Sequence, residues 1–211
     1  MVALVIAFYL LFQADAIRLY PVDDTARDPA FRSYVEKLRA AVEARSTRDL
    51  RKLVAKDVVV GPAKDEKGWD RFLARWRPEE AGSPLWPALG DLLSLGFIQE
   101  HPQLFLSPYL VWRFPDHLNM ATHLAVVRDK GALRETPSVR GSIVAWLEFD
   151  IVRQLGPVEG GEGLMQWVHV RTRERTGYVN TRDVRSPLMP RAQFAKLRGR
   201  WLLVALETPG R

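Results

Sequence analysis

Residues 123–186 contain short apolar runs at close spacing, separated by glycine, proline and charged residues. Each run is too short for a stable helix, and the spacing is typical of strands joined by turns. Several such strands in succession favour a small β-barrel. This stretch therefore constrains the fold more than any other part of the chain. The expected strands include 132–134, 143–147, 151–152, 167–170 and 176–179, with an open loop over 156–163.

Two motifs in this stretch resemble those of bacterial SH3-like (SH3b) domains. The first is a Leu-x-Arg-x-x-Pro-Ser signature after a strand, and the second is a Trp strand followed by Gly-Tyr-Val. The matching residues are Leu133, Arg134, Pro137 and Ser138, then Trp167, Gly177, Tyr178 and Val179. The resemblance implies an SH3-like β-barrel with an aromatic groove for extended peptides. Where the family usually has an Asn/Asp-Gly turn, residues 173–175 are Arg-Glu-Arg, which predicts a longer loop.

The predicted ligand surface combines aromatic and charged side chains of these motifs. Trp167 and Tyr178 each offer an apolar body with a polar tip. His169 shares a strand face with Trp167, because side chains alternate along a strand. Arg134 and Glu135 lie at the edge of the following loop. The predicted ligand-binding residues are therefore Arg134, Glu135, Trp167, His169 and Tyr178, and no catalytic residue, metal ligand or cofactor is predicted.

An apolar run over residues 2–12 precedes Ala14-Asp15-Ala16. An apolar run of this length before Ala-x-Ala is typical of a cleaved secretory signal. It is shorter than the roughly 20 residues that a transmembrane helix requires. We therefore predict a signal peptide over residues 1–16 and a periplasmic or other extracytoplasmic location. No Lys or Arg precedes the run, so either the n-region of the signal lacks its charge or the true start lies upstream. The alternative to a signal peptide is a buried first strand or helix.

Residues 28–118 predict a helix-rich half with few strands. Helix-capping residues and apolar spacing indicate helices that begin at Asp28, at Ser46 or Thr47, at Glu66 and at Ser83. The expected strands are 57–61, 104–106 and 109–112. The opening, two helices and then a strand, resembles the start of an NTF2-like α+β domain. Residues 28–211 as a whole resemble a family of exported bacterial SH3-domain proteins. The motifs that suggest this are Ser83-Pro84-Leu85-Trp86, Pro108-Tyr109 with Phe114-Pro115, Glu148-Phe149-Asp150-Ile151-Val152 and Arg198-Gly199-Arg200-Trp201.

The last segment, residues 191–209, predicts a β-hairpin around Arg198-Gly199-Arg200. Its second strand, 201–206, is apolar at every position, so both of its faces require cover. We therefore predict that the hairpin returns to the N-terminal domain and extends its sheet beside residues 104–112. The predicted fold is α+β. Its parts are a signal peptide (1–16), a helix-rich domain with a small sheet (17–118), an SH3-like β-barrel (119–186) and the C-terminal hairpin (187–211).

Charge and composition narrow the function. The chain has 31 Lys and Arg against 25 Asp and Glu, a net charge of +6, and the charges are interspersed. A basic surface attracts polyanions. The absence of cysteine excludes disulfides and thiolate nucleophiles. We predict a non-catalytic envelope protein that binds a cell-wall peptide or an envelope protein. We predict no nucleic-acid partner, and membrane contact only through the signal segment; the sequence does not indicate an oligomeric state.

Two alternatives remain at this point. One is an envelope enzyme with its active site in the N-terminal domain and the barrel as a targeting module. Acid/base candidates for such a site are Asp57, Asp65, Glu66 and Asp70. The other is a purely structural or assembly protein, in which the barrel is fixed to the helical part.

Overall fold

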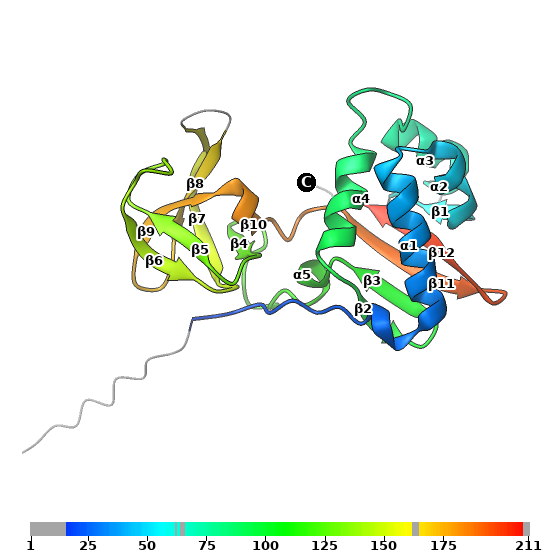
Figure 1. Cartoon of the computed structure of the whole chain (residues 1–211), viewed down its shortest axis with the longest axis horizontal. Helices are drawn as coiled ribbons and strands as arrows, with labels where there is room; N and C mark the ends of the chain where they lie inside the picture. Colours follow the sequence, from blue (N-terminus) through cyan, green and yellow to red (C-terminus); the bar gives the residue numbers. More distant parts are fainter. Residues whose placement is uncertain (1–15, 62, 64–65, 162–164, 209–211) are drawn as a thin grey trace, which may run out of the picture.

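The computed structural model has two β-sheets and, within the residues that it describes, five α-helices (Figure 1). Those residues are 16–61, 63, 66–161 and 165–208, so all but the last residue of the predicted signal peptide lies outside them. The α+β class is confirmed. Along this described part of the chain, no helix is both long enough and apolar enough to cross a membrane.

The first sheet is built from two distant parts of the chain, in the order β1-β12-β11-β3-β2. Strand β12 runs parallel to β1 and antiparallel to β11, and β11 runs antiparallel to β3. The strands are β1 (Val54–Val59), β2 (Ile98–His101), β3 (Leu104–Ser107), β11 (Arg191–Leu197) and β12 (Arg200–Glu207).

The predicted C-terminal hairpin is confirmed. Arg198 and Gly199 form its turn with φ values of 50° and 78°, and positive φ at both positions suits a two-residue hairpin turn. Ala192 lies opposite Ser107, so the hairpin extends the N-terminal sheet as expected. Because β11 and β12 lie between β3 and β1, they are the central strands of this sheet.

Helices cover the first sheet and begin where capping residues allow. Asp28 accepts a hydrogen bond from the Phe31 N–H at 2.9 Å, and Ser46 accepts one from the Asp49 N–H at 3.2 Å. Helix α3 begins later than predicted because residues 66–68 first pair with the end of β1. The helices are η1 (Thr25–Arg27), α1 (Pro29–Glu43), α2 (Thr47–Leu53), α3 (Trp69–Trp76), α4 (Leu85–Ser94) and α5 (Tyr109–Trp112).

Aromatic rings fill the space between α1 and the sheet. The Phe31 ring stacks on the Phe105 ring with centroids 3.7 Å apart, and the Trp201 ring meets Phe31 edge-on at 4.9 Å. Trp76 and Trp86 are buried in the same cluster, so these tryptophans are core residues.

The predicted strand over residues 109–112 is wrong, because these residues form the one-turn helix α5. Pro108 has no N–H to donate to a strand ladder, so β3 ends before it. Strand β2 was not predicted. Its residues Gln99, Glu100 and His101 are polar and give no alternating pattern, and its pairing with β3 places it in the sheet.

The second sheet has seven strands in the order β10-β4-β7-β8-β9-β5-β6 and curls around an apolar interior (Figure 1). Among the described residues β10 and β6 are its two edges, so the closed barrel that we expected is not seen. The strands are β4 (His123–Val126), β5 (Gly131–Arg134), β6 (Ile143–Leu147), β7 (Ile151–Gly160), β8 (Gln166–Arg171), β9 (Thr176–Asn180) and β10 (Val184–Arg185), with η2 (Thr181–Asp183) before β10.

Two connections of the second sheet, between β7 and β8 and between β8 and β9, were predicted to be loops. The open loop predicted over 156–163 is wrong as far as Gly160, because β7 continues to that residue, and residues 162–163 lie outside the described part of the chain. Gly156 and Pro157 lie where the β7–β8 register is irregular. Proline has no N–H group to donate, and an irregular ladder can accommodate it there. The longer loop predicted around residues 173–175 is confirmed: the Thr172 hydroxyl accepts hydrogen bonds from the Glu174 and Arg175 N–H groups.

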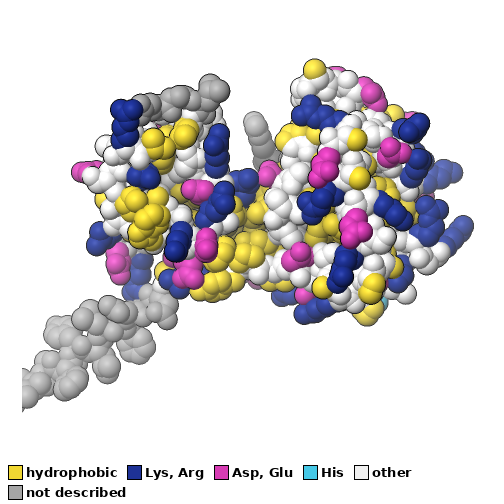
Figure 2. Space-filling view, viewed as in Figure 1, with side chains coloured by type: hydrophobic (Ala, Val, Ile, Leu, Met, Phe, Trp, Pro, Cys, Tyr) yellow, Lys and Arg dark blue, Asp and Glu magenta, His cyan; other side chains and the backbone are white. Residues whose placement is uncertain are grey.

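The two sheets meet across a third apolar cluster, and Figure 2 shows apolar side chains where the two lobes join. Tyr109 and Phe114 contribute from the side of the first sheet, and Ala125 and Ile151 from the second. The segment before the helices contacts both halves. Its start lies on the second sheet, where the Leu19 N–H donates to the Phe149 carbonyl and the Ile151 N–H to the Ile17 carbonyl, each at 2.8 Å, and its end lies on the first half, where the Asp24 N–H donates to the Phe97 carbonyl at 2.8 Å.

Candidate functional site

The outer face of the second sheet brings four of the five predicted ligand-binding residues together. Arg134 on β5 lies opposite Tyr178 on β9, and Tyr178 lies opposite His169 on β8. Trp167 shares this face with His169, since the intervening Val168 points into the apolar interior. The strand alternation that suggested this grouping is therefore observed.

Glu135 departs from the group. It follows the end of β5, its side chain is exposed, and its backbone N–H donates to the Ser142 carbonyl at 2.9 Å. It does not line the cavity that Arg134 and Trp167 border.

A groove of about 230 Å³ lies on this face and contains two of the predicted residues, Arg134 and Trp167. Its walls come from β5, from the segment after β5, from the start of β8 and from the end of β9 with η2. The complete lining is Arg128, Ala132, Arg134, Val139, Met165, Trp167, Asn180, Arg182 and Asp183. We call this feature the Trp167 groove.

Trp167 forms the floor of the groove, and only 2% of the residue is exposed. A Cβ atom at Gly161 would collide with the indole ring and with the Pro137 carbonyl, so both segments cover the ring closely. The indole Nε1–H is buried and has no hydrogen-bond partner among the described residues. Trp167 was predicted to bind the ligand, and the structure leaves only this small part of it open to the groove.

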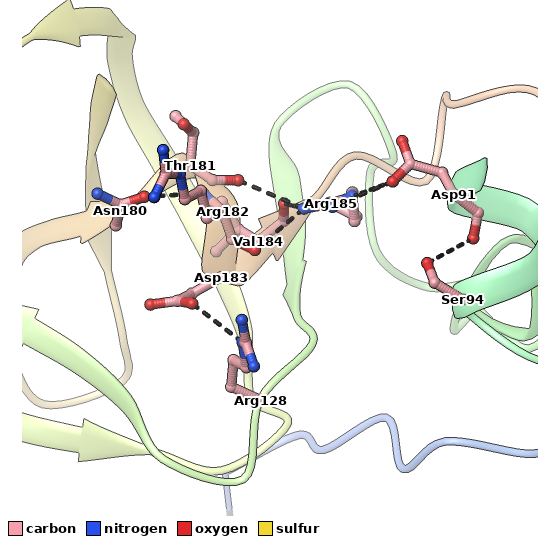
Figure 3. Close-up of polar contacts among 9 residues, drawn as sticks. All are labelled: Asp91, Ser94, Arg128, Asn180, Thr181, Arg182, Asp183, Val184 and Arg185. Atoms are coloured by element: carbon pink, nitrogen blue, oxygen red, sulfur yellow. Dashed lines mark hydrogen bonds and ion pairs between the residues drawn. The ribbon is translucent and has the colours of Figure 1, made fainter. Parts of the chain in front are cut away.

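The charged side chains around the groove are mostly cationic. Arg128 pairs with the Asp183 carboxylate at 3.2 Å, and Arg134 donates to the Gly141 carbonyl at 2.7 Å. The Arg182 guanidinium has no ion pair or hydrogen bond within the described part of the chain, although the Arg182 backbone N–H donates to Asn180 Oδ1 at 3.0 Å (Figure 3). Three arginines against one carboxylate favour an anionic ligand.

His169 and Tyr178 form a stacked pair beside the groove. Their ring centroids are 4.8 Å apart with an interplanar angle of 19°. Neither residue lines the groove itself. They extend its aromatic face along β8 and β9.

Arg128, Arg182 and Asp183 were missed by the sequence analysis. Asn180 caps η2, and an Asn before a short polar segment is a recognisable signal for such a turn. No local pattern, however, places Arg128 of the β4–β5 connection next to Asp183. That contact depends on the pairing of β10 with β4.

The groove lies close in sequence to the contact between the two sheets. Arg185, which follows η2, donates from Nη2 and Nε to Asp91 Oδ1 of α4 at 3.1 and 3.3 Å (Figure 3). The same guanidinium also donates to the carbonyls of residues 181, 182 and 184. Arg185 thus ties the end of the groove to the helix-covered half.

The acidic residues of the enzyme alternative show no organised site. Asp57 on β1 and Asp70 in α3 are exposed, and Asp65 lies outside the described residues. Glu66 accepts a hydrogen bond from the Ala63 N–H at 3.3 Å, within its own turn. Among the described residues, no group of three or more His, Asp or Glu side chains could hold a metal ion.

Comparisons of this chain with protein-family models, with curated proteins and with solved structures find no match.

Proposed function

We propose that this protein is an exported, non-catalytic SH3-like protein that binds peptide or cell-wall material in the envelope through the Trp167 groove. The SH3-like part is supported by the contact between its two motifs, since Arg134 of the first lies opposite Tyr178 of the second. The N-terminal half, with α1, α2 and β1 in that order, serves in this proposal as an NTF2-like support for the binding module.

The observation that carries the proposal is the composition of the groove. It has three arginines against a single carboxylate, an Arg182 guanidinium without a partner among the described residues, and the half-buried His169–Tyr178 stack beside it. Peptide-binding grooves combine such an aromatic surface with polar groups that fix the ligand. Cell-wall peptides that carry free carboxylates suit this charge.

Arg182→Gln tests the groove. It removes one exposed charge, and Arg32→Gln on the exposed face of α1 is the matched control. Sedimentation with purified cell-wall sacculi measures retention of each variant. We expect Arg182→Gln to bind roughly tenfold more weakly, because a hydrogen bond to a charged group is lost. The control should bind as wild type does. We also expect binding to weaken between low and physiological salt. Retention that depends neither on salt nor on Arg182 would exclude the groove as the binding surface.

Export is the second part of the proposal. The segment after the predicted cleavage point is anchored: Ile17 accepts a hydrogen bond from β7, and Arg18 forms a bridge with Asp150. A chain cut after Ala16 would therefore begin at an anchored residue. The intact mass of protein from the envelope fraction tests this, and a full-length cytosolic product would contradict it.

A structural or assembly function is the second candidate, favoured by the apolar cluster that joins the sheets and by the Arg185–Asp91 contact. This function predicts that the protein binds neither sacculi nor acidic peptides, and that it unfolds in one cooperative transition.

A further inference from the structure

A second cavity, of about 320 Å³, lies on the second sheet and shares no lining residue with the Trp167 groove. It is bordered by the anchored segment at residues 16–17, by β4 and β7, and by the β8–β9 loop. Its lining residues are Ala16, Ile17, Leu118, His123, Asp150, Ile151, Arg153, Arg171, Thr172 and Arg173. We call it the arginine cleft.

Three basic side chains form a row across neighbouring strands at this cleft. His123 on β4 lies opposite Arg153 on β7, and Arg153 lies opposite Arg171 on β8. Directly opposed residues of an antiparallel pair have Cβ atoms about 5 Å apart, and like charges in such positions repel. Arg153 and Arg171 are such a pair, so an anion between their guanidinium groups would relieve the repulsion.

Nothing in the described protein neutralises the two arginines of this row. Arg153 and Arg171 are exposed, and neither has an ion pair or a side-chain hydrogen bond within the residues that the structure describes. Arg173 lines the same cleft from the loop.

One carboxylate, that of Asp150, lines the cleft, and it is already engaged. Its Oδ2 accepts a hydrogen bond from the Glu148 N–H at 2.6 Å, and its Oδ1 lies 4.0 Å from the Arg18 Nε. Asp150 therefore pairs with Arg18 of the anchored segment and with the backbone of its own turn. It does not neutralise Arg153 or Arg171.

The other members have fixed positions that leave room for a ligand. His123 Nδ1 lies 3.0 Å from the Asn119 carbonyl, which leaves its Nε2 without a partner in the described chain. The Thr172 hydroxyl donates to the Arg175 carbonyl at 3.1 Å and holds the loop in place. Ile17, Leu118 and Ile151 give the cleft an apolar side.

We infer that the arginine cleft is a second ligand site and that it binds a phosphate group. Guanidinium groups match phosphate oxygens in paired hydrogen bonds. The two guanidinium groups on adjacent strands carry five N–H donors each, more than the roughly four lone-pair sites of one carboxylate can accept. A phosphate monoester or pyrophosphate provides enough acceptors, and so does a phospholipid headgroup whose acyl chains meet the apolar side.

The test uses the full chain and a double variant, Arg153→Gln with Arg171→Gln. Arg32→Gln with Arg39→Gln on α1 removes the same charge from exposed positions elsewhere and is the matched control. Isothermal titration with inorganic pyrophosphate measures the soluble ligand. Co-sedimentation with phosphatidylglycerol vesicles, against phosphatidylcholine vesicles, measures the lipid source.

We expect pyrophosphate or phosphatidylglycerol binding to weaken about tenfold for each arginine removed, and the control to bind as wild type does. If the double variant loses affinity for pyrophosphate, the ligand is a soluble phosphate compound. If it loses affinity for the vesicles alone, the ligand is a lipid headgroup. If neither probe binds, or if both double variants lose affinity equally, the inference is wrong. Arg182→Gln should leave phosphate binding intact, which separates this site from the Trp167 groove. Loss of phosphate binding in Arg182→Gln would move the site to that groove and overturn the inference.

Discussion

Two tryptophans, Trp201 and Trp146, lie in opposite surroundings, one buried and one exposed. Trp201 is 5% exposed and lies against Phe31 and Phe105, whereas Trp146 on β6 is 63% exposed. We expect Trp201→Ala to lower the free energy of unfolding by about 3–5 kcal/mol, because it leaves a cavity in the aromatic core. Trp146→Ala should change it by less than about 0.5 kcal/mol. Urea unfolding measures both, and equal effects would contradict the packing described for β12.

Asp28 joins α1 to the returning hairpin and gives stability a pH dependence. Partial burial opposes ionisation of its carboxyl, but the Phe31 N–H and the Lys196 ammonium, 3.2 Å away, outweigh it and lower the pKa of Asp28. A carboxyl with a lowered folded-state pKa stabilises the protein above its unfolded pKa, about 3.9, and this contribution is lost as the pH falls through the folded value.

Asp28→Asn keeps a capping oxygen and loses the charge. We expect wild type to be more stable than Asp28→Asn at pH 7, and the difference to shrink as the pH falls below about 4. Urea unfolding at several pH values measures it. A difference that is constant from pH 7 to pH 2 would show that the charge does not contribute.

At the same scale, the candidate site was only partly predictable. Arg134, Trp167, His169 and Tyr178 were found because they stand in recognisable motifs and because strand alternation puts them on one face. Arg182, whose guanidinium has no partner among the described residues, gave no such signal, since its position depends on the turn of η2 that follows β9.

At the scale of elements, apolar spacing predicted the long helices best, whereas the strand expected at 57–61 lies at Val54–Val59. Helix α1 begins and packs as its pattern indicates. Elements defined by their neighbours were missed: β2 is a strand only because β3 pairs with it, and residues 109–112 are apolar on all sides and turn into a helix after a proline. Short apolar runs do not distinguish buried strand from buried helix.

The hairpin of β11 and β12 provides the central strands of the first sheet, so truncation after Ser186 is the test at this scale. We expect the truncated protein to lose cooperative thermal unfolding and solubility, because α1 and β3 lose their packing partners. Truncation after Thr208, beyond β12, is the control and should unfold as wild type does. A soluble, equally stable product after Ser186 would contradict the observed strand order.

At the scale of the whole molecule, the apolar cluster between the sheets couples their stability. Phe114 is buried in it beside residues of both sheets. We expect Phe114→Ala to split a single calorimetric transition into two, because the halves then unfold separately. Trp146→Ala should keep one transition. If Phe114→Ala still unfolds with equal calorimetric and van't Hoff enthalpies, the cluster does not couple the sheets.

Along the sequence, the whole second sheet lies between β3 and β11, two strands that pair with each other in the first sheet. This order has a consequence for folding. Ser107 and Ala192 are partners in the ladder although about 85 residues separate them. The entropy lost on closing a loop rises with its length, and long-range pairings slow folding. The strands of the second sheet pair over shorter separations in the sequence, so this sheet can fold first. Its folding brings β3 and β11 close to each other. During synthesis, the apolar faces of α1 and α4 emerge well before β11 and β12 exist to cover them. Apolar surface that is exposed in this way makes the chain prone to aggregation until its last strands are made.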